Sequence, residues 1–552
     1  MNRKKSYLLL ILIVYSAFFF RIWNINLIPP SLNWDEVSLG YNAYSILKTG
    51  KDEWGIKFPL MFRVYGDYKL PLYIYLTSIS EFFLGLNALS VRLVSILSGV
   101  GLVIFSFLIT KKITKSVEYS LIASLLTALS PWSLFLSRVA LEANLGAFLF
   151  AGGVFFIVCW FKDDKRKNLI WAMICWGLSI HAYNSARIII PLMFIFLIFI
   201  SFKKKTLRSL FIPVLILIIF SLPLIFQIFN RSAGARFNLV SLVDQGTINQ
   251  IIEKRNDLKL PNPVPRIIFN KATFFLYFSV KNYLSNLSFR YLFLRGGSHY
   301  QFSIPDHELL FLVTVPFLII GILKTLVKKT DAEKFLGFWF FISFIPSAVT
   351  RDAPHVLRTI FVLPCPMIFT AIGIKFVSDF LMSHKSFFKG NLLLTIFLLS
   401  VFVSFGKWWA DYINIYPKAY SWAWQYGYKE AVSFIKQNYD KYDKILVTKR
   451  YGEPHEFILF NYPWNPSIYQ TDPGKIWDYH ADWYWIDGFD KFVFINDWEV
   501  IEKVSAMQRL KDSKKRYLLV TSPGNYPEGW NKIKTIEFFD GKSVFEILEK
   551  EN

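Results

Sequence analysis

Two adjacent acidic residues, Asp35 and Glu36, follow the first long apolar run of the sequence. Consecutive residues of a helix point roughly 100° apart, so only one of the two carboxylates can be aimed at a given atom. We assign Asp35 as the reactive acid, which could take a proton from an acceptor hydroxyl, and Glu36 as its supporting partner. The alternative is that both acids only complement the dipole at the start of a helix.

A second group with chemical potential lies just before the apolar segment 70–76. Asp67 and Lys69 lie there, with Tyr65 before them and Tyr68 between them. An ammonium in this position could contact a phosphate at a membrane surface. Equally, Lys69 could serve only as an interfacial anchor, with the tyrosines in the aromatic belt.

Further polar residues stand at the ends of apolar runs. Ionisable groups at membrane depth are costly and are functional candidates by default. Arginine and lysine stabilise the negative charge that develops when a sugar–phosphate bond breaks, and a phosphate leaves without a general acid. One carboxylate that accepts a proton is then enough, so the set fits transfer of a sugar from a lipid phosphate. Its members are Arg138, Glu142, His181, Tyr183, Arg187, His355 and Arg358.

The elements that must position these residues are membrane helices. The chain has 552 residues, of which 54% are hydrophobic, and its apolar runs approach the roughly 20 residues that cross a bilayer as a helix. We predict about eleven spans, near residues 6–24, 91–110, 118–136, 142–161, 169–186, 187–202, 209–229, 306–325, 335–350, 357–380 and 391–408.

The distribution of basic residues predicts the orientation of these spans. With the N-terminus in the cytoplasm, each inner loop is rich in lysine and arginine, as the positive-inside rule requires. These loops are residues 1–6, 111–117, 162–168, 202–208, 324–334 and 383–390. The net charge of +22 is thereby explained without nucleic acid. We expect a multi-pass protein of the cell membrane.

Three long segments then face outward. The sequence predicts a membrane domain, residues 1–408, with outer loops 24–90 and 230–305, and an extracytoplasmic soluble α/β domain, residues 409–552. In the second domain, 429–438 is a predicted helix, and 444–448, 517–521 and 543–548 are predicted strands. In the first loop, apolar and aromatic residues indicate amphipathic helices along the interface.

No metal or disulfide is predicted. Cys159, Cys175 and Cys365 all fall within apolar segments, where a cysteine acts as a small core residue. The acids together with His355 could hold a divalent metal, but no dense ligand spacing supports one.

Six short motifs stand out in the sequence: Asp35-Glu36 and residues 67–73, 91–100, 137–142, 291–299 and 354–358. They resemble the C-type membrane glycosyltransferases, and within them the dolichyl-phosphate-mannose–protein mannosyltransferase and lipid A aminoarabinose transferase group (glycosyltransferase family 39). The resemblance covers roughly residues 1–410. It implies the C-type fold, Asp35 as catalytic base, and contact of Lys69 and Asp67 with the donor phosphate region. Tyr68 separates Asp67 from Lys69, whereas the aminoarabinose transferases have the acid and the lysine adjacent.

The sequence therefore favours an inverting, mannosyltransferase-like enzyme. It would move a sugar from a polyprenyl-phosphate donor in the lipid bilayer to a hydroxyl of a protein, lipid or envelope glycan. A transporter or flippase of lipid-linked sugar is the alternative, although that class places its ionisable residues near the bilayer midplane and often in repeated halves. A scaffold or sensor without catalytic activity would leave the grouped charges unexplained.

Overall fold

The computed structural model describes residues 3–66, 68–229, 241–258, 261, 263–327, 330–383, 387–480, 483–509 and 515–550. Packing divides the chain into two compact units. The first unit is Met1–Trp23 with Ser95–Trp409, and the second is Asn24–Val94 with Ala410–Asn552. The first outer segment is thus grouped with the C-terminal residues, whereas the division made from the sequence assigned it to the membrane domain.

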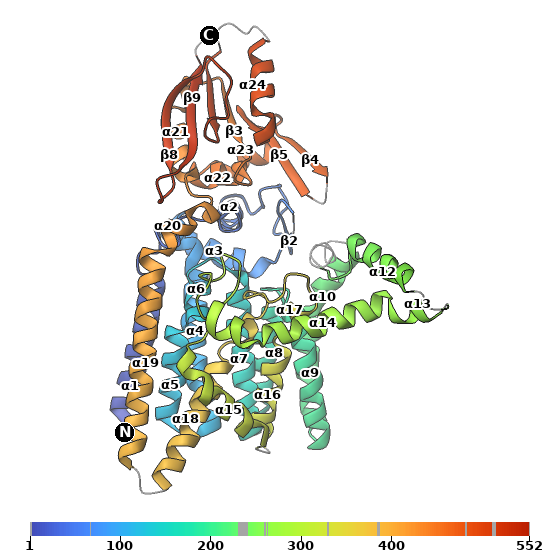
Figure 1. Ribbon diagram of the computed structural model, residues 1–552, viewed down its shortest axis with the longest axis vertical. Coiled ribbons are helices and arrows are strands. Elements are labelled where there is room, and N and C mark those ends of the chain that lie inside the picture. Colours follow the sequence, from blue (N-terminus) through green and yellow to red (C-terminus); the bar gives the residue numbers. More distant parts are fainter. Residues whose placement is uncertain are drawn as a thin grey trace. The chain divides into compact units, whose positions relative to one another are not determined.

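The first unit is a bundle of apolar helices (Figure 1). Helix α14 runs across the direction of the long helices, and α12 and α13 continue from it. The long or apolar helices are α1 (Arg3–Ile22), α4 (Ala88–Thr114, its first turns in the second unit), α5 (Val117–Leu129), α6 (Pro131–Ser137), α7 (Glu142–Asp163), α8 (Arg166–Ile180), α9 (Ala186–Lys203), α10 (Phe211–Phe229), α15 (Val315–Val327), α16 (Asp331–Ile342), α18 (Cys365–Ser383) and α19 (Phe387–Asn414).

Shorter elements connect these helices. They are η1 (Leu207–Leu210), α12 (Gln245–Asp257), α13 (Val264–Ile268), α14 (Lys271–Asn286), η2 (Tyr291–Arg295), η3 (Leu312–Thr314), α17 (Ile345–Ala348) and η4 (Ile360–Val362).

Seven helices within the described residues are long and apolar enough to cross a membrane, and eight if the bent pair α5–α6 forms one span. Each predicted span falls on a helix, but the number of about eleven is not confirmed. Three of the predicted spans fall on α8, α15 and α16, which have only 15, 13 and 12 residues. A crossing needs about 20 residues, so apolar composition alone overestimated the length of these helices.

Close helix contacts in the bundle depend on glycine, which has no side chain. Helices α15 and α18 pack together. A Cβ atom on Gly321 would lie 1.9 Å from the Phe369 carbonyl oxygen, and one on Gly373 would lie 1.9 Å from that of Phe317. Small residues let membrane helices approach to backbone contact, so this reciprocal pair fixes the crossing.

The second unit contains a mixed seven-stranded sheet in the order β4-β5-β6-β3-β7-β9-β8, in which β3 is parallel to β6 and β7 and the other pairs are antiparallel. The central strands β3 and β7 are almost entirely buried. The strands are β3 (Lys444–Thr448), β4 (Ile476–His480), β5 (Trp483–Phe489), β6 (Phe492–Ile495), β7 (Tyr517–Thr521), β8 (Asn531–Glu537) and β9 (Ser543–Lys550).

The helices of this C-terminal part are α20 (Tyr416–Tyr420), η5 (Ser421–Trp424), α21 (Tyr428–Gln437), η6 (Tyr439–Lys441), α22 (Pro454–Asn461), α23 (Pro466–Thr471), η7 (Asp497–Glu499) and α24 (Val500–Arg509).

The first outer segment packs onto this C-terminal part. It forms α2 (Trp34–Thr49), a short antiparallel ladder of β1 (Phe62–Arg63) with β2 (Tyr68–Lys69), and α3 (Pro71–Leu84). Helix α2 contacts α3, α22 and α23. A Cβ atom on Gly40 would lie 2.5 Å from the Phe460 ring, so α2 approaches α22 closely only because residue 40 is glycine.

Candidate functional site

Helix α2 begins at a capping box, and this cap places both acids. The Asn33 side chain accepts a hydrogen bond from the Glu36 backbone N–H at 2.9 Å, and Glu36 Oε2 accepts one from the Asn33 N–H at 3.2 Å. Such reciprocal bonds satisfy the free donors at a helix start. They fix Glu36 toward the protein and leave Asp35 on a different face.

Asp35 is partly exposed and is held by two side chains of the same unit. Lys69 Nζ lies 2.5 Å from Asp35 Oδ1, and the Tyr65 hydroxyl donates to the same oxygen at 2.9 Å. The Asp35 side chain is 37% exposed, whereas that of Lys69 is 8% exposed. Lys69 is positioned by the ladder, where it pairs with Phe62. The arrangement is an accessible carboxylate beside a largely buried ammonium.

Tyr65 acts as a hydrogen-bond donor in this arrangement. Burial, and then the negative charge of Asp35, raise the pKa of its hydroxyl well above the ordinary value. The phenol therefore stays protonated and keeps donating to the carboxylate.

Glu36 is fully buried in a bidentate ion pair with Arg92 of α4. Arg92 Nε and Nη2 each lie 2.8 Å from one carboxylate oxygen. The same guanidinium donates to the backbone carbonyls of Ile25 and Ser31, at 2.7 Å each. Through Arg92, Glu36 therefore fixes helix α4 against the segment that precedes α2. Sequence analysis did not single out Arg92. The only signal for it in the sequence is a charged residue in an apolar run.

Tyr65, whose hydroxyl binds Asp35, belongs to a cluster of aromatic rings. The Tyr65 ring lies 5.6 Å from Trp34 and 5.2 Å from Trp483, measured between centroids. Trp483 belongs to β5 of the C-terminal part. Flat rings beside an accessible carboxylate offer a stacking surface for a sugar.

Within the first unit, Arg138 is fully buried and binds the end of α1. Its guanidinium donates to the carbonyls of Phe20 and of Trp23, the latter at 2.8 Å, and lies 5.5 Å from the Trp409 ring. It thereby satisfies backbone oxygens that a helix end leaves without intrahelical partners. Glu142 begins α7 and is partly buried.

A second set of predicted residues meets in the first unit, around the turn between α8 and α9. His181 Nε2 donates to the Phe220 carbonyl at 2.7 Å, and the Tyr183 ring stacks on Phe361 at 6.4 Å. Arg187 lies in the first turn of α9 and is partly buried.

The segment of His355 and Arg358 joins this set. Ser185, in the same turn, donates to the Arg358 carbonyl at 3.4 Å. The Arg358 guanidinium donates to Thr350 Oγ1 at 2.7 Å and pairs with Asp352 at 3.1 Å, and His355 Nδ1 accepts from the Arg358 backbone N–H at 3.3 Å. A hydrogen bond thus links the turn that carries His181, Tyr183 and Arg187 to the segment that carries His355 and Arg358.

The predicted residue Asp67 lies outside the described residues. The three cysteines are free, as expected, and Cys159 and Cys365 are buried. The metal-binding combination considered from the sequence used the acids and His355. Within the described part of the chain, the candidate metal group consists of other residues, Glu53, His455 and Glu456.

Comparison with known proteins agrees with this architecture. The profile of the dolichyl-phosphate-mannose-protein mannosyltransferase family matches residues 69–226. No curated protein matches the chain in sequence.

Solved structures of membrane transferases share the fold. ArnT from Cupriavidus metallidurans in the apo state superposes with a TM-score of 0.58 at 10% identity, covering 100% of this chain and 98% of that chain. The same protein bound to undecaprenyl phosphate gives a TM-score of 0.56 at 10% identity, covering 99% and 98%.

The oligosaccharyltransferase of Archaeoglobus fulgidus in the apo form gives a TM-score of 0.52 at 15% identity over 83% of this chain. This chain spans 64% of that protein, which is less than two thirds of its length. At such identities the likeness concerns the fold. The chain therefore has the fold of the C-type membrane glycosyltransferases, and its sequence resembles their dolichyl-phosphate-mannose-protein mannosyltransferase family.

Proposed function

We propose that this protein transfers a sugar from a polyprenyl-phosphate donor to an acceptor hydroxyl, with inversion at the anomeric carbon and with Asp35 as the general base. The observation that carries the proposal is the accessible Asp35 carboxylate with Lys69 Nζ 2.5 Å away. The undecaprenyl phosphate bound to ArnT, a protein of the same fold, supports a donor of this class.

The proposed reaction is a single displacement. Asp35 accepts the proton of the acceptor hydroxyl while the acceptor oxygen attacks the anomeric carbon. The bond between that carbon and the phosphate oxygen breaks, and polyprenyl phosphate leaves. Lys69 exchanges its contact with Asp35 for one with the departing phosphate, where its charge offsets the negative charge that develops. This exchange frees the carboxylate when the donor is in place.

We infer the orientation from the basic loops. The N-terminus lies in the cytoplasm, and the C-terminal part with Asp35 lies on the extracytoplasmic side of the cell membrane. A polyprenyl chain holds its phosphate at the bilayer surface, so the donor is presented to Asp35 from the outer leaflet. The acceptor is a hydroxyl of a protein, lipid or envelope glycan.

The test is transfer of radiolabelled sugar from polyprenyl phosphate to an envelope extract in proteoliposomes. We expect Asp35→Asn to lower kcat by more than about 100-fold, because general base catalysis contributes about 10²–10⁴-fold. Asp540→Asn, at an exposed acid of the same unit, is the matched control and should transfer at the wild-type rate.

Size-exclusion profiles must show that Asp35→Asn remains folded and inserted. Normal turnover by that variant would overturn the mechanism. If the wild type moved label from none of several donor sugars but carried the intact lipid across the bilayer, the transporter alternative would replace the proposal.

A further inference from the structure

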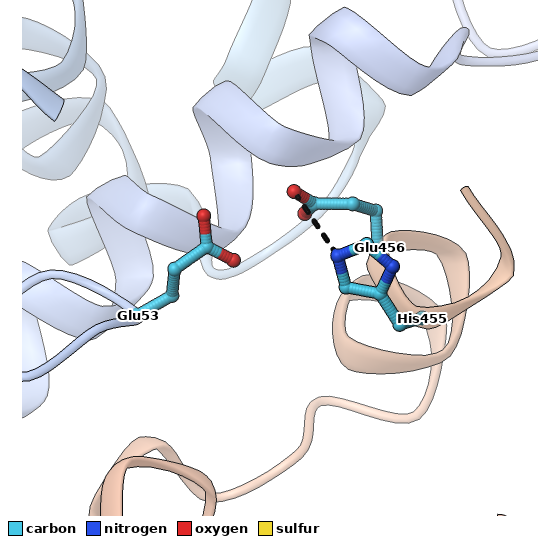
Figure 2. A group of neighbouring side chains, drawn as sticks. All are labelled: Glu53, His455 and Glu456. Atoms are coloured by element: carbon cyan, nitrogen blue, oxygen red, sulfur yellow. Dashed lines mark ion pairs between the residues drawn. The ribbon is translucent and has the colours of Figure 1, made fainter. Parts of the chain in front are cut away.

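Three ligand-type side chains meet inside the second unit, apart from the contacts of Asp35. Glu53 follows α2 in the first outer segment, and His455 and Glu456 lie in the first turn of α22. One donor atom from each residue lies within 4.8 Å of the others, and Figure 2 shows their polar ends facing one another. The residues are only 2%, 3% and 1% exposed.

The carboxylates of this cluster have oxygen atoms to which the protein provides no hydrogen bond. Within the described residues, no hydrogen bond is made by Glu53 Oε2 or by either carboxylate oxygen of Glu456. The buried Ser38 hydroxyl faces Glu456 without reaching hydrogen-bond geometry. Buried polar atoms are nearly always paired, and a buried carboxylate without a partner is especially costly. The cluster therefore has bonding capacity directed at something besides the chain.

Surrounding residues orient two of the three side chains, Glu53 and His455, as they do around metal ligands. Asn42 donates to Glu53 Oε1 at 3.1 Å and accepts from the Glu53 backbone N–H at 3.2 Å, which leaves Oε2 pointing into the cluster. His455 Nε2 lies 3.7 Å from Glu456 Oε1, while its Nδ1 faces Glu453 Oε2 at 3.5 Å. A carboxylate behind the second nitrogen is the usual support of a metal-bound histidine.

Glu453 is itself fixed, because Trp483 Nε1 donates to its other oxygen at 2.6 Å. Thus two of the three side chains have a polar side chain behind them that sets their direction. Such support is expected for a built site and is not needed for core packing.

The charges of the neighbourhood fit a cation. Burial lowers the pKa of His455 to about 3, with Lys449 and Lys475 adding to the effect, so the imidazole is in the neutral form that binds metals. Burial raises the pKa of Glu53 to about 7 and that of Glu456 well above its ordinary value, because ionised carboxylates are poorly compensated there. The other charged groups that act on these acids are Asp35, Asp52, Arg63, Glu453 and Lys475.

We propose that Glu53, His455 and Glu456 bind one divalent transition-metal ion, Zn²⁺ or Mn²⁺. Two carboxylates balance its charge, and a mixed oxygen and nitrogen set suits these ions better than Ca²⁺ or Mg²⁺. Three protein ligands leave a position for water. The inference is independent of the proposed sugar transfer.

Only small movements are needed to form the site. Ligands about 2.0–2.2 Å from a tetrahedral Zn²⁺ stand roughly 3.3–3.6 Å from one another. The separation of His455 and Glu456 is already close to this value, and Glu53 closes the triangle from the other segment. The ion would link the first outer segment covalently, through coordination bonds, to α22.

The test is metal content of the purified full-length protein by mass spectrometry, after removal of loosely bound ions. We expect one Zn²⁺ or Mn²⁺ per chain in the wild type. Glu53→Gln and His455→Gln should each weaken binding by more than about tenfold. The matched control is His480→Gln, because His480 pairs with Asp478 at an exposed surface and should not matter.

A second measurement uses the wild type, so it does not depend on how a variant folds. Chelator-treated wild type is titrated with Co²⁺, which should give visible absorption bands that saturate at one equivalent and disappear when Zn²⁺ is added. Glu453→Gln should keep the stoichiometry but lower the affinity about 10–100-fold. Wild type that retains no ion and shows no saturable Co²⁺ bands would overturn the proposal, as would equal loss in His480→Gln.

Discussion

Asp35 and Glu36 are adjacent residues with opposite environments. Asp35 is 37% exposed and contacts Lys69, whereas Glu36 is fully buried against Arg92. A rotation of roughly 100° about the helix axis separates a carboxylate that can exchange partners from one that cannot. The sequence predicted two roles for the pair, and the environments supply the physical difference between them.

The first prediction at this scale concerns the buried pair. Arg92→Ala should destabilise the protein by about 3–5 kcal/mol, because it leaves Glu36 charged and unpaired inside the unit. Arg92→Lys should restore little, since an ammonium cannot replace the bidentate contact and the two carbonyl bonds. Thermal unfolding in detergent measures the effect. Unchanged stability in Arg92→Ala would contradict the role given to this pair.

Glu81 of α3 provides a prediction about pH. This helix is not among the membrane-spanning candidates. Glu81 is 2% exposed, and within the described residues neither carboxylate oxygen has a hydrogen-bond partner. Burial raises its pKa to about 9.

Because the folded state holds this proton more tightly than the unfolded state, stability is lost as pH rises from about 4.5 towards 9. Glu81→Gln removes that loss and should stabilise the protein by about 3 kcal/mol at pH 7, with almost no effect near pH 4.5. Unfolding temperatures of both proteins across this range measure it. A benefit that is equal at both ends of the range would exclude the explanation by burial.

At the scale of elements, periodic and buried segments were the predictable ones. The predicted strands 444–448 and 517–521 coincide with β3 and β7, whose residues are buried, and the predicted helix 429–438 differs by one residue at each end from α21. Strands β4 and β8, which are almost wholly exposed, were not predicted. Strands β5 and β6 were missed as well, although β6 is largely buried. The ends of α8, α15 and α16 were not predicted either, because each helix ends within a continuous apolar stretch of sequence.

The candidate site was predictable only in part. Asp35 and Lys69 lie in one segment. The residue types indicated Asp35 as a base, and the family resemblance implied contact of Lys69 with the donor phosphate region. The partnership of Glu36 with Arg92, and that of Tyr65 with Trp483, depend on tertiary packing between segments. Residue types and spacing carry no information on such pairs.

The loops between helices test the orientation. The three native cysteines are first replaced, and Lys165→Cys or Lys542→Cys is introduced at exposed positions. A maleimide that cannot cross membranes should label residue 542 in intact cells, and residue 165 only after permeabilisation. The reverse pattern would place Asp35 in the cytoplasm and contradict the proposed use of an outer-leaflet donor.

At the scale of the molecule, the second unit is assembled from Asn24–Val94 and Ala410–Asn552. Deleting residues 410–552 leaves Asp35, Glu36 and Lys69 in the chain but removes α22, which packs on α2, and Trp483 beside Tyr65. We expect the shortened protein to insert, because the first unit has its own packing, yet to lose detectable transfer. The proteoliposome assay measures this. Transfer at the wild-type rate would show that α2 holds its geometry without the C-terminal part.

This discontinuous assembly has a consequence in time. At about 5–20 residues per second, synthesis from Val94 to the end of β9 takes on the order of 20–90 s. Until α22 and α23 have been made and have folded, α2 lacks them to pack against. Its apolar face is then open to chaperones and proteases. Nascent and prematurely terminated chains would thus carry the acidic pair without a formed catalytic surface, so sugar donor would not be consumed by unfinished protein.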